Sequence, residues 1–271
     1  MIHADYALAH QLEYLICAEY RRLCEVGRSV FPGKGVECIE VGGGAALWLG
    51  AGSPVNAAVG LGMDDRISES DLQRLETFYH HRGAAALTSV CQMADPTLFE
   101  LLGRRGWTLT GFEHVLALEL DLAVSHPLDM DLEVRVCNEE ERQLWARIAA
   151  RGFADGRAAD PPHREFGRIM AARPEPILVL AWVDGEPAGT GSLMIDGGVG
   201  WLTGDSTLPQ YRGRGVQQAI QRHRLQLARE AGCDLTVTEA VPGSGSQRNM
   251  ERLGFRIVYT HVEFTKVATS R

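Results

Sequence analysis

The chain has 271 residues, of which 45% are hydrophobic and 23% are charged, so it can bury a sizeable core and has room for two domains. Its formal charge of −8 disfavours nucleic acid as the main partner, because proteins that bind nucleic acids are usually basic. The sequence has no apolar run of about 18 residues for a membrane span and no apolar N-terminal signal segment. We therefore expect a cytoplasmic protein.

The cysteines indicate thiols rather than disulfides or a metal site. No two of the six form a Cys-x-x-Cys pair, and in a cytoplasmic protein isolated cysteines are usually reduced. The histidines and cysteines also lack the spacing of metal ligands. We predict no metal.

Apolar periodicity predicts the elements of the first half. The first is a helix that carries Leu8, Leu12, Leu15, Ile16 and Leu23 and ends at Gly27. It is followed by strands at 36–41, 45–49 and 57–61, a helix at 68–79, a strand at 85–91, a helix at 96–104, and one or two strands over 107–120. Residues 121–131 then lose periodicity and predict a linker.

The second half predicts a longer series of elements. Strands are expected at 132–137, 177–183, 187–195, 199–207, 235–240 and 255–264. A helix is expected to follow Asn138, its cap, and to run to about residue 153. Further helices are expected at 163–172, 215–231 and 246–253. Hairpin-connected strands followed by a crossover helix favour an α+β fold, with a mixed, mostly antiparallel sheet flanked by helices.

The two halves resemble each other in element order. In each, strands, a helix, a strand and a second helix lead to a similar segment, LLGRRGWTL in the first half and NMERLGFRI in the second. We interpret this as a tandem duplication, with domains at 1–125 and 130–271.

A glycine-rich turn at 212–217 joins the strand at 199–207 to the next helix. Glycines at such a turn let backbone N–H groups face inward, and the helix dipole adds to the attraction for an anion. Arg212 and Arg214 contribute positive charge. The turn therefore predicts a pyrophosphate site. It lacks the GxGxxG spacing of dinucleotide-binding proteins and the lysine of a Walker loop.

This turn resembles that of the GNAT superfamily of N-acetyltransferases, and the resemblance covers about residues 130–268. The family pattern [QR]xxGx[GA] is in register from Arg212, which puts Gln217 where the family has Gly or Ala. Gly254-Phe255 matches the family's closing GF. The resemblance implies acetyl-CoA as co-substrate. Its pyrophosphate would lie on Gly213–Gln218 and its pantetheine arm along 205–207, so that the implied cofactor-binding residues are Ser206, Thr207, Arg212, Gly213, Arg214, Gly215, Val216, Gln217 and Gln218.

The family's usual catalytic residues are replaced. Met250 stands where the family has a Tyr that protonates the leaving thiolate, and Thr238 stands where it has a carboxylate. Asp205, beside the expected thioester, and Glu239, if the strand slips by one residue, are the two candidate bases. The alternatives are a turn residue or a structural hydrogen bond for Asp205 and a surface acid at the end of the strand for Glu239.

Two further regions keep alternative interpretations. Ser244, Ser246 and Asn249 either cap the last helix or touch the adenine side of the cofactor. The first half has Gly62-Met63-Asp64-Asp65-Arg66 where a phosphate turn is expected. Because two aspartates repel a pyrophosphate, we interpret that half as a degenerate GNAT-like domain without cofactor.

The resemblance implies an acyltransferase that moves an acetyl group from acetyl-CoA to a primary amine of a small molecule or peptide, directly in a ternary complex. The main alternative is a non-catalytic acyl-CoA-binding or regulatory module, and a third interpretation is a nucleotide-phosphate enzyme. We expect a monomer or homodimer with no membrane partner.

Overall fold

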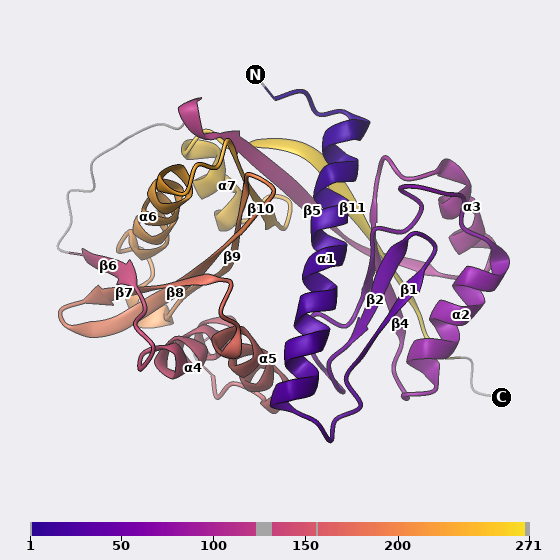
Figure 1. The fold of residues 1–271 in the computed structure, drawn as a ribbon, viewed down its shortest axis with the longest axis horizontal. Coiled ribbons are helices and arrows are strands. Elements are labelled where there is room, and N and C mark those ends of the chain that lie inside the picture. Colours follow the sequence, from indigo (N-terminus) through magenta and orange to yellow (C-terminus); the bar gives the residue numbers. More distant parts are fainter. Residues whose placement is uncertain (1, 123–131, 156, 269–271) are drawn as a thin grey trace. The chain divides into compact units, whose positions relative to one another are not determined.

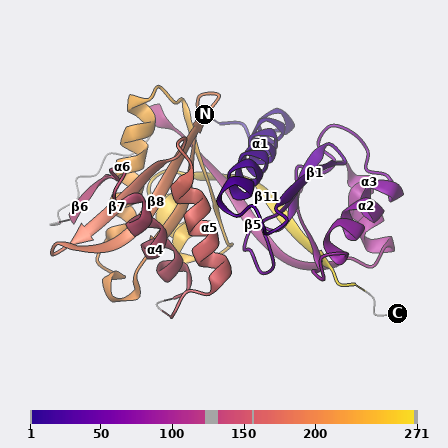
Figure 2. The ribbon, with the colours of Figure 1, turned by 60° about the horizontal axis from the view of Figure 1, so that its bottom comes forward.

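The computed structural model describes residues 2–122, 132–155 and 157–268, shown as a ribbon in Figures 1 and 2. Contacts divide the chain into two compact units. The C-terminal unit is formed mainly by Leu116–Arg256, and the N-terminal unit by His3–Val115 together with the residues from Ile257 onward. The predicted linker at 121–131 lies almost entirely outside the described residues. The last strand groups with the N-terminal unit, whereas the predicted domains at 1–125 and 130–271 assign it to the C-terminal one.

The C-terminal unit is built on a mixed sheet. Its strand order is β10-β9-β8-β7-β6, antiparallel except for the parallel pair β10–β9. The strands are β6 (Leu132–Val136), β7 (Ile177–Val183), β8 (Glu186–Asp196), β9 (Val199–Thr207) and β10 (Leu235–Ala240). The helices are α4 (Arg142–Phe153), α5 (Pro161–Ala172), α6 (Val216–Glu230) and α7 (Gly245–Arg252), with a 3-10 turn η2 at Pro209–Tyr211.

Helices cover both faces of this sheet. Figure 2 shows α4 and α5 together on one face and α6 on the other. At the paired strands β8 and β9, Gly204 faces Trp145 of α4, whereas Gly191 faces Ile220 and Arg224 of α6. Strands that are buried on both faces are expected to be rich in apolar and small residues. The central residues of β7 and β8 are buried and are mostly of these kinds.

The N-terminal unit repeats the pattern in shorter form. Its strand order is β1-β2-β3-β4-β11-β5, with α1 on one face and α2 and α3 on the other (Figure 1). The strands are β1 (Glu37–Val41), β2 (Gly44–Trp48), β3 (Ala58–Val59), β4 (Ala86–Cys91), β5 (Thr108–Glu119) and β11 (Arg256–Lys266). The helices are α1 (Tyr6–Val30), α2 (Glu69–His80) and α3 (Pro96–Arg104), with a 3-10 turn η1 at Leu120–Leu122.

Strand β11 is anchored in the N-terminal unit by a buried polar cluster. It pairs antiparallel with β4 from His261 to Lys266. Tyr259 donates a 2.7 Å hydrogen bond to the Glu13 carboxylate of α1, and His261 Nε2 lies 2.6 Å from the same oxygen. All three side chains are buried. Because a buried carboxylate is costly without partners, this cluster fixes where β11 lies.

The sequence predictions of fold class and elements are confirmed, with local corrections. Ser68 caps α2 through a capping box with Asp71. Asn138 caps a turn at 139–141 rather than α4 itself, which begins at Arg142. Its side chain accepts from the Glu141 N–H at 3.0 Å. None of the helices within the described ranges is long and apolar enough to cross a membrane.

Candidate functional site

The glycine-rich turn leads directly into α6. Gly213 and Gly215 adopt φ values of +73° and +75°, a region that other residues enter only at a cost. Gly215 precedes Val216, the first residue of the helix, and no side chain caps this end. The N–H groups of the first helical turn have no partners within the helix, so they are available to an anion. The helix thus begins at Val216, directly after the glycine-rich turn, so that its first N–H groups lie where a phosphate turn requires them.

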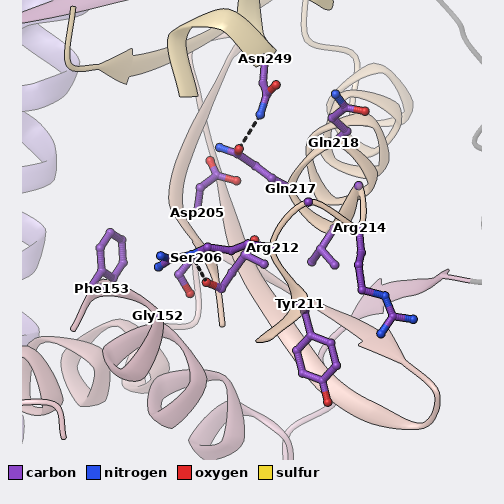
Figure 3. Close-up of a pocket in the computed structure, with 14 residues that line it drawn as sticks. Gly152, Phe153, Asp205, Ser206, Tyr211, Arg212, Arg214, Gln217, Gln218 and Asn249 are labelled. Carbon is purple, nitrogen blue, oxygen red and sulfur yellow. Dashed lines mark hydrogen bonds between the residues drawn. The ribbon is translucent and has the colours of Figure 1, made fainter. Parts of the chain in front are cut away.

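A single cavity of about 620 Å³ brings the predicted cofactor residues together (Figure 3). All nine line it, and so does Asp205. Glycines 213 and 215 form its rim on the side of α6, while Ser206 and Thr207 belong to the end of β9. The strand end and the helix start therefore face one space, as pantetheine and pyrophosphate binding would require.

The strand pair β8–β9 is irregular at the position of Asp205. Its register shifts between Thr190 and Ser192, so two residues of β9 oppose one of β8, as in a β-bulge. The buried Arg224 of α6 donates to both strands beside this bulge, at 2.8 Å to the Ser192 carbonyl of β8 and at 2.9 Å to the Thr203 carbonyl of β9. Its second nitrogen donates to Asp205 at 2.5 Å. Arg224 therefore fixes both the bulge and the acid.

Both arginines of the turn have carboxylate partners. Arg212 pairs with Asp155 in the loop after α4, and Arg214 pairs with Asp184 at 3.2 Å. All four side chains are substantially exposed, and exposed ion pairs contribute little to stability. The guanidinium groups can therefore turn toward an anion at small cost.

The other candidate acid lies outside this cavity. Glu239 follows Thr238, and the pairing of β10 with β9 runs without interruption from Leu235 to Thr238, so these paired residues show no slip. Thr238 is buried and donates to the Leu202 carbonyl at 3.1 Å. Glu239 is not among the residues that line the cavity.

Met250, at the position of the family's tyrosine, belongs to the hydrophobic core. It is completely buried and packs in a cluster with Leu253, Phe255 and other apolar side chains. It cannot donate a proton, because its thioether carries none. Tyr259 does not substitute for it, since its hydroxyl is bound to Glu13 in the N-terminal unit.

Three lining residues were not assigned to the site from the sequence. These are Gly152 and Phe153 at the end of α4, and Tyr211. Asn249 of α7, expected either to cap that helix or to touch the cofactor, also lines the cavity. Asn249 donates to the Gln217 side chain at 2.8 Å, and Gln217 in turn donates to Ser246 at 3.3 Å. Ser244 caps α7. Of the two interpretations of this segment, capping applies to Ser244, whereas Asn249 lies at the cavity.

Comparison with known proteins identifies the C-terminal unit. The acetyltransferase (GNAT) family matches residues 132–255. This part of the chain is therefore similar to a GNAT domain. A search of curated protein sequences gives no match.

Solved structures extend the similarity of fold beyond the GNAT domain. A GCN5-related N-acetyltransferase from Kribbella flavida is 20% identical, with a TM-score of 0.65 over 91% of this chain and 95% of that one. A tandem GNAT protein from the clavulanic acid biosynthesis pathway is 16% identical, with a TM-score of 0.61 over 92% and 89%. A functionally unknown conserved protein from Staphylococcus epidermidis is 12% identical, with a TM-score of 0.59 over 86% and 94%. The fold is thus GNAT-like across both halves.

Proposed function

We propose that this protein is an acetyl-CoA-dependent N-acetyltransferase that acts on a primary amine of a small molecule or peptide. The observation that carries the proposal is the one cavity of about 620 Å³ that contains the phosphate turn, the end of β9 and Asp205. Membership of residues 132–255 in the GNAT family supports acetyl transfer in general. The amine class of the acceptor rests on the resemblance to this family, and the mechanism rests on the placement of Asp205 at the cavity.

Acetyl-CoA would bind as a co-substrate along the rim of this cavity. Its pyrophosphate would accept hydrogen bonds from N–H groups between Gly213 and Gln218, where the helix dipole is positive. Its pantetheine arm would lie along Ser206 and Thr207. Arg212 and Arg214 would exchange their aspartate partners for phosphate oxygens, which guanidinium groups bind with the same bidentate geometry.

The transfer itself is direct. The amine nitrogen attacks the thioester carbonyl, the new C–N bond forms, the C–S bond breaks, and CoA leaves as a thiolate. An ammonium has no lone pair, so the acceptor must first lose one proton to solvent, and its nitrogen loses a second proton as the new C–N bond forms. Asp205 is the acid that lines the cavity beside the cofactor residues, and it would accept that proton directly or through a water.

Met250 stands at the helix position where the family has a tyrosine. The side chain at that position therefore cannot give a proton to the leaving thiolate. Positioning alone contributes strongly to reactions of activated esters, and the thiolate is a stable leaving group that can take its proton from water. The buried Met250 and Thr238 nevertheless favour a second candidate function. This is a non-catalytic acyl-CoA-binding or regulatory module.

The N-terminal unit would be a degenerate GNAT-like domain without a cofactor. At the position of the phosphate turn, Asp64 lies 2.5 Å from His10 and Asp95 pairs with Arg66 at 3.5 Å. Acidic side chains at this point repel phosphate. This unit would serve structure or the acceptor side of the reaction.

A screen of primary amines with acetyl-CoA, read out as free thiol, separates the candidate functions. The enzyme predicts thiol release that depends on both acetyl-CoA and a particular amine, with stoichiometric N-acetylated product by mass spectrometry. Tight CoA binding with no release from any amine would favour the binding module. Thermal stabilisation by ATP but not by CoA would contradict both, since only a bound ligand stabilises the native state.

A further inference from the structure

A second cavity adjoins the first in the groove between α6 and α7. Its volume is about 290 Å³, far above the share of about 30 Å³ that one water molecule occupies in the liquid. Gln218 and Asn249 line both cavities. Gln218 projects from α6 and Asn249 from α7 (Figure 3). A ligand bound at the phosphate turn could therefore extend into this groove.

The second cavity carries unbalanced positive charge. Its remaining lining residues are Arg222, Arg252 and Leu253, and within the described part of the chain its lining includes no carboxylate. Neither arginine takes part in an ion pair with a described residue. This distinguishes them from Arg212, Arg214 and Arg224, each of which has an aspartate partner.

The hydrogen bonding of the two guanidinium groups is incomplete. The Nε of Arg222 is buried and has no acceptor among the described residues. Arg252 donates from Nη1 to the Asn249 side chain at 3.2 Å, and a guanidinium has five N–H donors in all. Buried donors are nearly always satisfied in native proteins. The remaining donors therefore suit an oxyanion with several acceptor oxygens.

We propose that Arg222 and Arg252 form a phosphomonoester subsite that binds the 3′-phosphate of CoA. The inference rests on the proposed function, because it takes CoA to be the molecule at the phosphate turn. The adenosine end of the co-substrate leaves the pyrophosphate on the side of Gln218 and enters the groove between α6 and α7. Two guanidinium groups from different helices then bind the 3′-phosphate, as arginines commonly bind phosphate oxygens. The site discriminates CoA from its dephosphorylated form.

The test is calorimetric titration of the full chain with CoA and with 3′-dephospho-CoA. We expect wild type to bind CoA about tenfold or more tightly than 3′-dephospho-CoA, the size of effect expected for hydrogen bonds to charged groups. Arg222→Gln and Arg252→Gln should each weaken CoA binding while leaving 3′-dephospho-CoA binding almost unchanged. Binding of the dephosphorylated ligand also shows that each variant is folded.

Arg248→Gln is the matched control. Arg248 lies on the same helix as Arg252 and donates to the Gly243 carbonyl at 3.0 Å, but it does not line the second cavity. Its substitution removes the same charge and should preserve the preference for CoA. Equal affinity of wild type for the two ligands, or an equal loss in Arg248→Gln, would overturn the subsite. If wild type binds neither ligand, the proposed function itself fails.

Discussion

The guanidinium of Arg224, which has no solvent exposure, donates a 2.5 Å hydrogen bond to the carboxylate of Asp205 at the cavity wall. The same helix, α6, presents the phosphate turn at its N-terminus. One helix therefore sets the position of both the anion site and the acid. A change in the placement of α6 would move the two together, which keeps their spacing constant.

Asp205→Asn is expected to lower turnover by about 10²- to 10⁴-fold, the usual range for loss of a general base. The neutral amide keeps the size of the side chain but cannot accept the amine proton. CoA affinity should stay close to wild type, because the phosphate turn is untouched. Steady-state kinetics and calorimetry measure the two effects. Glu239→Gln is the comparison, and a turnover loss equal to that of Asp205→Asn would refute the assignment.

Gly215→Ala is expected to weaken CoA binding by about tenfold. A side chain at φ = +75° costs about 1–2 kcal/mol, and relief of this strain would turn the N–H groups away from the pyrophosphate. Gly197→Ala is the matched control, because Gly197 has φ = +54° in an open turn where an added Cβ meets nothing within 4 Å. The control should lose stability but retain CoA affinity. Equal affinities for the two variants would show that the turn is not the binding site.

Gly152→Ala is expected to destabilise the protein by about 1–3 kcal/mol, as overpacking does. A Cβ at Gly152 would lie 2.5 Å from the Ser206 hydroxyl oxygen and 2.6 Å from its Cβ, so the end of β9 must shift and CoA affinity should fall as well. Gly103→Ala in α3 meets nothing within 4 Å and should stabilise by about 0.5–1 kcal/mol. Chemical denaturation measures both. A neutral Gly152→Ala would contradict the close packing of α4 on β9.

The cysteines are expected to react slowly with iodoacetamide at pH 8. Burial raises the pKa of Cys17 and of Cys137 to about 12 and that of Cys38 to about 11. Only the thiolate reacts, so labelling of the native protein should speed up about tenfold per pH unit in this range. Under denaturing conditions the pKa values return to about 8.5 and labelling should be fast. Rapid labelling of the native protein at pH 8 would contradict the burial of these thiols.

Local patterns in the sequence were sufficient to predict most elements and the phosphate turn. Alternation of apolar residues and the glycines at 213 and 215 act over a few neighbouring residues, and they predict β9 and α6 to within one residue. Asn138 makes the hydrogen bond of a cap, to the Glu141 N–H, but it caps a turn at 139–141 and α4 begins only at Arg142.

Features that depend on distant contacts could not be predicted in this way. The grouping of β11 with the N-terminal unit arises from pairing with β4 and from the contact of Tyr259 and His261 with Glu13, more than 240 residues away. The presence of Gly152 and Phe153 at the cavity depends on how α4 packs on the sheet. No local pattern distinguishes Arg224, which is fully buried, from the half-buried Arg222 and the exposed Arg229 of the same helix.

A crystal structure of the protein with CoA would show where the co-substrate binds. We expect the pyrophosphate on the N–H groups of Gly213 to Gln218, with the sulfur end of the molecule at the β9 bulge and the Asp205 carboxylate facing it. CoA bound elsewhere on the chain, or bound at the turn with its sulfur directed away from Asp205, would contradict the proposed function.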